Sequence, residues 1–123
     1  MKRVFAVATV SLVAAVLAMA GATAQAGHPG GGLSKMDSVN PDSYDTYRVV
    51  FYGGEFAQVR VHGYGRTVLA LAVYDSAGNL VVVDNDRDGS DCLVTWVPPY
   101  NQTYTIRVIN PASISNTYWV STN

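Results

Sequence analysis

The sequence is poor in the residues from which catalytic and metal centres are most often built. Its 123 residues include one cysteine and two histidines. A single cysteine cannot form an internal disulfide, and these three residues offer no zinc-ligand spacing. The G-x-S-x-G motif is missing, and the acidic residues gather in one loop instead of facing each other across a cleft. We therefore expect a protein that is not an enzyme.

Positive charge is also scarce. The chain carries eight basic and nine acidic residues, for a net charge of −1. Because Lys2 and Arg3 stand at the very start, the remainder of the chain is more acidic than this average. Nucleic-acid binding and docking on an anionic membrane both need a basic face. The charge balance argues against both partners.

The first 26 residues have the pattern of an export signal. A positively charged start precedes an uncharged apolar run over residues 4–20, and the small residues Ala24-Gln25-Ala26 follow. We expect a signal peptide over residues 1–26, cleaved before Gly27, with Ala22-Thr23-Ala24 as the second choice of cleavage pattern. A retained membrane anchor is the alternative, because the run is near the lower length limit for a span. The sequence thus predicts a secreted or periplasmic protein without a membrane span after cleavage.

The remaining chain divides into a lead-in and a domain. Residues 27–43 are rich in glycine and proline and show no periodicity, so we expect a flexible lead-in there. From residue 44 to residue 123, short runs alternate between apolar and polar residues and are separated by turn signals, and no amphipathic helix is apparent. This pattern predicts an all-β fold, an antiparallel β-sandwich (jelly-roll or immunoglobulin-like) of about seven to eight short strands. The expected strands cover residues 47–52, 57–62, 68–74, 80–83, 92–97, 104–109 and 116–122.

The order of these motifs resembles a known family. Asp45–Phe51 followed by a glycine pair, Leu71–Asp75 followed by Gly78-Asn79-Leu80, and Thr103–Val108 are similar to segments of bacterial pre-peptidase C-terminal domains. The resemblance implies a small β-sandwich of the kind usually appended to secreted peptidases, where it is thought to aid export, substrate contact or surface attachment. Related modules of bacterial collagenases bind collagen and calcium. Gln102 departs from the family, which usually has glycine there, and no catalytic domain accompanies the module, so we expect a free-standing one.

An acidic loop is the strongest local feature. Residues 84–91 match the pattern D-x-D-x-D-G, in which alternate carboxylates and a glycine turn place oxygen atoms around Ca²⁺. The loop is not an EF-hand, because Thr95 stands where a bidentate glutamate is needed and strands are expected on both sides. We expect weak calcium binding, with a dissociation constant of about 10⁻⁴–10⁻³ M. The alternative is a solvated acidic turn. The candidate metal ligands are Asp84, Asp86, Asp88, Ser90 and Asp91.

Three tyrosines and one cysteine complete the candidates. Tyr52, Tyr64 and Tyr100 lie at expected strand ends or in loops, where a ring can stack on a sugar or anchor a protein contact. Ordinary packing is the alternative for all three. Cys92 falls on the apolar face of an expected strand, which favours a buried, inert thiol. The other interpretations of Cys92 are an intermolecular disulfide and a nucleophile assisted by His62.

The sequence therefore predicts a secreted, non-catalytic accessory or binding module, with calcium as a candidate cofactor. Its expected partner is an extracellular protein or a polysaccharide. The alternative is a structural component of the cell envelope or extracellular matrix that acts through self-association and has no dedicated ligand.

Overall fold

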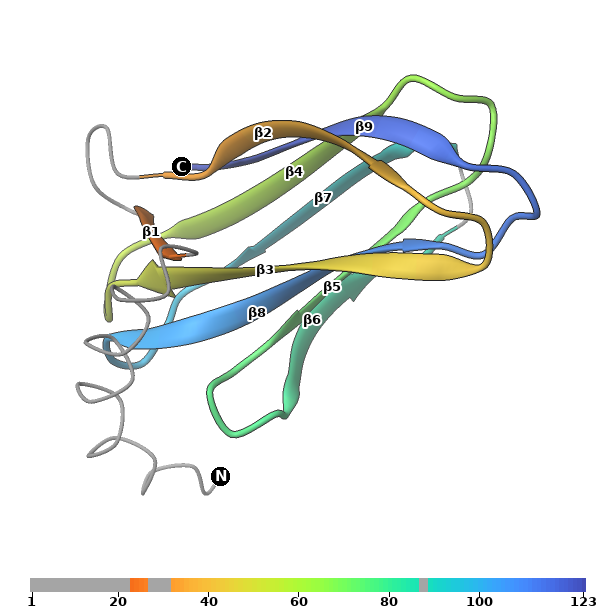
Figure 1. Cartoon of the computed structure of the whole chain (residues 1–123). Helices are drawn as coiled ribbons and strands as arrows, with labels where there is room; N and C mark the ends of the chain where they lie inside the picture. Colours follow the sequence, from red (N-terminus) through yellow and green to blue (C-terminus); the bar gives the residue numbers. More distant parts are fainter. Residues whose placement is uncertain (1–22, 27–31, 87–88) are drawn as a thin grey trace.

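The computed structural model describes residues 23–26, 32–86 and 89–123, which form two packed β-sheets without a helix (Figure 1). The five-stranded sheet has the order β1-β3-β8-β5-β6, and the four-stranded sheet has the order β2-β9-β4-β7. The strands are β1 (Thr23–Ala26), β2 (Ser34–Val39), β3 (Ser43–Phe51), β4 (Ala57–Gly63), β5 (Ala70–Tyr74), β6 (Leu80–Asp84), β7 (Asp91–Trp96), β8 (Gln102–Asn110) and β9 (Asn116–Thr122).

The predicted all-β sandwich is confirmed. Strands β2 to β9 pair in antiparallel fashion, and β1 alone runs parallel to its neighbour β3. The seven strands expected from alternation correspond to β3 through β9, each within two residues at its ends, except that β3 begins four residues earlier than expected. Their agreement follows from the two-residue period of a strand, which places every second side chain on the buried face.

The expected flexible lead-in over residues 27–43 is wrong for part of its length. Ser34–Val39 form β2, whose six residues all pair with β9. Alternation does not reveal this edge strand, because Val39 is its only fully buried residue and the others lie exposed or half-buried. Backbone pairing and a hydrogen bond from the Tyr47 hydroxyl to Asp37 hold the strand in place. The folded domain thus begins before Tyr44.

The core lies between the two sheets. Strand β4 supplies Val59 and Val61, both fully buried, and the facing sheet supplies Phe51 and Tyr104 at 1% exposure each. Trp96 of β7 closes the core at one end, with its ring centroid 4.8 Å from that of Phe51 and 5.2 Å from that of Tyr104. Burying each such side chain contributes about 1.5–3 kcal/mol relative to exposure. The inner faces are therefore fully used in folding, and binding chemistry must come from the outer faces and loops.

Candidate functional site

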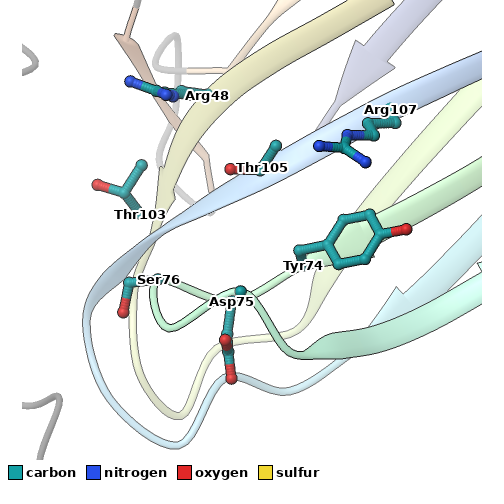
Figure 2. A pocket seen from close by; sticks show the side chains of 8 residues that line it. Arg48, Tyr74, Asp75, Ser76, Thr103, Thr105 and Arg107 are labelled. Carbon is teal, nitrogen blue, oxygen red and sulfur yellow. The ribbon is translucent and has the colours of Figure 1, made fainter. Parts of the chain in front are cut away.

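A pocket opens on the outer face of the five-stranded sheet. Strands β3, β8 and β5 are neighbours there, and the register aligns Arg48 of β3 and Tyr74 of β5 with Thr105 of β8 between them. The cavity has a volume of about 330 Å³, and Figure 2 shows the side chains around it. Its lining residues are Arg48, Tyr74, Asp75, Ser76, Gly78, Thr103, Thr105 and Arg107.

The guanidinium of Arg107 is held between two aromatic rings. Its central carbon lies 4.6 Å from the centroid of the Tyr44 ring and 5.0 Å from that of the Tyr74 ring. Tyr44 and Tyr74 belong to β3 and β5, the strands on either side of β8. Cation–π contact with both rings restrains the position of the guanidinium, whose N–H donors lie in its own plane.

Two polar atoms at this pocket are buried without a partner. The hydroxyl oxygen of Thr103, a residue only 5% exposed, makes no hydrogen bond among the described residues. The Nε atom of Arg107 is likewise buried without a hydrogen-bond partner in that part of the chain. Because unpaired buried polar groups cost about 1–3 kcal/mol each, they mark places where a ligand or water supplies the missing bond.

The β5–β6 hairpin forms one wall of the pocket. Asp75 Oδ1 accepts hydrogen bonds from the backbone N–H groups of Ala77 (3.0 Å) and Asn79 (2.8 Å), and its Oδ2 lies 3.3 Å from the Asn79 side-chain amide. Gly78 adopts a φ of 89°, a conformation that favours glycine and closes the turn. Ser76 is tied to β8, because its hydroxyl donates to Gln102 Oε1 over 2.7 Å. The wall is thus anchored at both ends.

The charge of the pocket is predominantly positive. Arg48 and Arg107 contribute two guanidinium groups, and neither forms a salt bridge among the described residues. Asp75 is the single acidic lining residue, and its carboxylate is occupied by the N–H groups of its own turn. The arrangement offers several unused donors to an anionic group.

Sequence reasoning did not identify this pocket. Arg48 and Arg107 are 59 positions apart and both occupy outward positions of alternating strands, where a polar residue is expected in any sandwich. The available signal is that two strands each carry an outward arginine, but only the pairing of β3 with β8 brings the two together.

The acidic loop is only partly gathered by the fold. Asp84 ends β6, and its Oδ2 accepts a hydrogen bond of 2.9 Å from the backbone N–H of Leu93. Asp91 begins β7, and its Oδ1 lies 2.7 Å from Nδ1 of His62 on β4. Asp86 is exposed, and Asp88 lies outside the described residues. The two ends of the loop therefore use their carboxylates on strand contacts.

The remaining predicted ligand, Ser90, faces inward. Its hydroxyl donates to the backbone oxygen of Thr67, and its own carbonyl accepts a hydrogen bond of 3.0 Å from the N–H of Gly63. Among residues 32–86 and 89–123, no three His, Cys, Asp or Glu side chains lie close enough together to hold a metal ion. Because Asp88 lies outside the described residues, calcium binding remains a prediction that rests on the sequence pattern.

The three candidate tyrosines do not share one surface. Tyr64 follows the end of β4, is 56% exposed, and contacts His62 edge-on with ring centroids 4.8 Å apart. Tyr52 precedes the other end of β4, and both it and Tyr100 are half-buried. Tyr100 lies next to Gly53, where an added Cβ would collide with its backbone. The fold therefore separates Tyr64 from the other two.

Cys92 is buried, as its place on the apolar face predicted. The residue is 3% exposed, and its Sγ donates to the backbone oxygen of Leu69 over 3.3 Å. Burial, with a smaller contribution from the carboxylates of Asp84, Asp86 and Asp91, raises the pKa of the thiol from 9.0 to about 12. A nucleophilic or metal-binding cysteine needs the opposite shift.

Comparison with known proteins supports the fold and leaves the ligand open. No family model matches the sequence, and no curated protein matches it. The pre-peptidase C-terminal domain of a Bacillus anthracis collagenase is similar in structure, with a TM-score of 0.61, 12% identity, and coverage of 82% of this chain and 94% of that one. The fold implied by the sequence resemblance is thereby confirmed.

Two other structures have the same architecture. CorA, a surface-associated copper-binding protein of Methylomicrobium album BG8, has a TM-score of 0.64 at 8% identity, covering 82% of this chain and 96% of that one. PliG of Aeromonas hydrophila, a periplasmic inhibitor of g-type lysozyme, has a TM-score of 0.53 at 13% identity, covering 82% and 94%. The TM-scores and coverage show a shared fold, and at identities this low the likeness extends to the fold alone. The chain has the same β-sandwich fold as these three structures.

The described part of the chain contains no helix long and apolar enough to cross a membrane.

Proposed function

We propose that this protein is an exported, non-catalytic binding module that holds an extracellular protein or polysaccharide in the pocket between β3, β8 and the β5–β6 hairpin. The observation that carries this proposal is that Arg48, Arg107 and Thr103, whose hydroxyl has no partner among the described residues, line one cavity. Binding sites in proteins are typically concave, with a few placed polar groups beside an aromatic surface, and this pocket has each of these parts.

The absence of a reactive group at the pocket supports a binding role. Its lining residues include no histidine and no cysteine. Cys92 is sealed in the core, and His62 lies on the four-stranded sheet, where it pairs with Asp91. Three of the structural neighbours are named as a pre-peptidase C-terminal domain of a collagenase, a surface-associated copper-binding protein and a periplasmic lysozyme inhibitor, which fits a binding role.

The proposal is tested by binding of the purified chain to an array of polysaccharides and immobilised extracellular proteins. We expect saturable binding to one class of array member, weakened at least about tenfold in the Arg48→Ala/Arg107→Ala double variant, because each charged hydrogen bond contributes about 1.5–3 kcal/mol. Arg60→Ala is the matched control, since Arg60 is exposed on the four-stranded sheet and lies away from the pocket. Saturable binding that survives the double substitution would place the site elsewhere.

Export is part of the proposal and has its own test. The two periplasmic or surface-associated neighbours and the apolar start of the sequence both support it. We expect the intact mass of the exported protein to correspond to a chain that begins at Gly27. This cleavage removes β1 and leaves the edge of β3 without its parallel neighbour. A mature mass that includes Met1 would contradict signal cleavage.

Self-association is a second candidate function, favoured by one edge of the sandwich. Strand β6 lies at the end of the five-stranded sheet, and its Leu80, Val81 and Val83 side chains are 54%, 38% and 42% exposed. Exposed apolar edge strands pair readily with other chains unless charge or proline protects them. Sedimentation velocity over a range of protein concentrations tests this role, with Val83→Lys as the variant expected to abolish any oligomer.

A further inference from the structure

The pocket has features that select one class of ligand. We infer that it binds a sugar residue that carries a carboxylate, that is, a uronic acid unit of an acidic polysaccharide. This inference rests on the proposed function and adds the chemical class of the ligand.

The first step concerns charge. Arg48 and Arg107 line one cavity, and no described carboxylate forms a salt bridge with either. Asp75, the acidic residue of the wall, accepts hydrogen bonds from three N–H groups of its turn. The pocket therefore presents a net positive charge in a chain whose overall charge is −1. An anionic group is the complementary ligand.

The second step concerns the shape of the anion. Because Tyr44 and Tyr74 both contact the guanidinium of Arg107, its position is restrained, and its N–H donors lie in its own plane. A planar fork of this kind matches the two oxygens of a carboxylate. The buried Nε of Arg107, which lacks a partner among the described residues, is one of these donors.

The third step distinguishes a sugar from an acidic peptide. The lining of the cavity includes the hydroxyl side chains of Thr103, Thr105 and Ser76 and the side chain of Tyr74. The Thr103 hydroxyl is buried and unpartnered within the described part of the chain, so its hydrogen-bonding capacity is unused. A uronic acid offers ring hydroxyls next to its carboxylate, whereas an aspartate or glutamate side chain offers the carboxylate alone. The cavity of about 330 Å³ lies at the lower end of the range for small-ligand sites.

The inference is tested by isothermal titration with polygalacturonate and with the same polymer after methyl esterification, which removes the charge and keeps the rings. We expect binding to the free acid that weakens with added salt, and at least about tenfold weaker binding to the ester. Equal binding of the two polymers would overturn the carboxylate inference and leave the binding module standing. Binding of poly-glutamate as tight as that of polygalacturonate would overturn the inference that the ligand is a sugar.

Two conservative variants separate recognition from folding. Arg107→Lys keeps the charge and removes the planar fork, so we expect affinity for polygalacturonate to fall about tenfold. Thr103→Val removes an unpartnered hydroxyl at nearly constant volume, so we expect weaker binding with an unchanged or higher melting temperature. Full affinity in both variants would overturn the inference. Failure of the wild-type chain to bind any polysaccharide, with saturable binding to a protein through this pocket, would also overturn it and preserve the proposed function.

Discussion

The hydroxyl of Tyr118 donates a hydrogen bond of 2.6 Å to Asp45 Oδ2, and this bond joins β9 of the four-stranded sheet to β3 of the five-stranded sheet. Tyr118 is fully buried, and the hydroxyl of Tyr47 lies 2.5 Å from its own. The open side of the sandwich is thus closed by a polar cluster. Burial and the hydrogen bond to the Asp45 carboxylate raise the pKa of Tyr118 well above its ordinary value, which keeps the bridging proton in place.

Removing the Tyr118 hydroxyl should lower the stability of the fold, because it breaks the hydrogen bond to Asp45. Tyr118→Phe leaves the half-buried Asp45 carboxylate without its donor, and we expect the free energy of unfolding to fall by about 1–3 kcal/mol. Tyr44→Phe is the control, because Tyr44 is exposed on the same strand as Asp45, and it should change stability by less than about 0.5 kcal/mol. Urea unfolding measures both. Equal stability of Tyr118→Phe and wild type would mean that water replaces the lost bond.

Stability should fall at alkaline pH. Burial raises the pKa values of Tyr47, Tyr104 and Cys92 each to about 12. A group whose pKa is raised on folding holds its proton more tightly in the native state, so its contribution is complete below the unfolded value and is lost as pH rises through the folded one. The stabilising contribution therefore begins to be lost near pH 9.0 for the thiol and near pH 10.0 for the phenols, and its loss is complete near pH 12.

Urea midpoints across this pH range check the sign. We expect a constant midpoint from about pH 7 to 9 and a decline above it, with a shallower decline in Tyr104→Phe, which removes one titrating group and keeps the ring. A midpoint that stays level to about pH 11 would contradict the burial of these groups.

The thiol of Cys92 should be inert in the native protein. Because the thiolate is the reactive form, a thiol with a pKa of about 12 inside the core reacts slowly with disulfide reagents at neutral pH. We expect no labelling by Ellman's reagent under native conditions, full labelling in urea, and a single monomer band on a non-reducing gel. Rapid native labelling or a disulfide-linked dimer would show that β7 opens readily.

Calcium binding remains to be measured, since the predicted ligand Asp88 lies outside the described residues. The sequence pattern predicts that millimolar calcium raises the melting temperature by about a few degrees, as expected for a weak extracellular site. The double variant Asp86→Ala/Asp88→Ala should lose this shift, whereas Glu55→Ala, an exposed acidic residue outside the loop, should keep it. A wild-type melting temperature that is the same in calcium and in chelator would exclude a functional calcium loop.

Alternation in the sequence was sufficient to predict most of the sandwich. Val59 and Val61 of β4, with polar residues between them, indicate a half-buried strand, and both valines are fully buried. The hairpin around Gly78 follows from the same local rules, because glycine tolerates the positive φ that closes the turn. The sequence pattern did not predict β2. Five of its residues are polar or exposed and give no periodic signal, and the strand is held by pairing with β9.

The candidate site was harder to predict from the sequence than the fold. The acidic loop is conspicuous because its residues are consecutive, yet the structure uses Asp84 and Asp91 for strand contacts. The pocket is inconspicuous because each of its arginines is an ordinary outward residue of its own strand. No local sequence pattern predicts that Arg48 and Arg107 line one cavity, or that Tyr44 and Tyr74 both contact the guanidinium of Arg107.

The sequence by itself determined which side chains face the core, where the chain turns, and that the chain lacks the usual catalytic signatures. These properties depend on neighbours along the chain, through the two-residue period of a strand and the conformational freedom of glycine. Only the tertiary structure decided that β3, β8 and β5 lie side by side and so gather two guanidinium groups, a buried hydroxyl and an aromatic ring in one pocket. The reason is that strand order is set by how two whole sheets bury their apolar faces, which no short segment specifies.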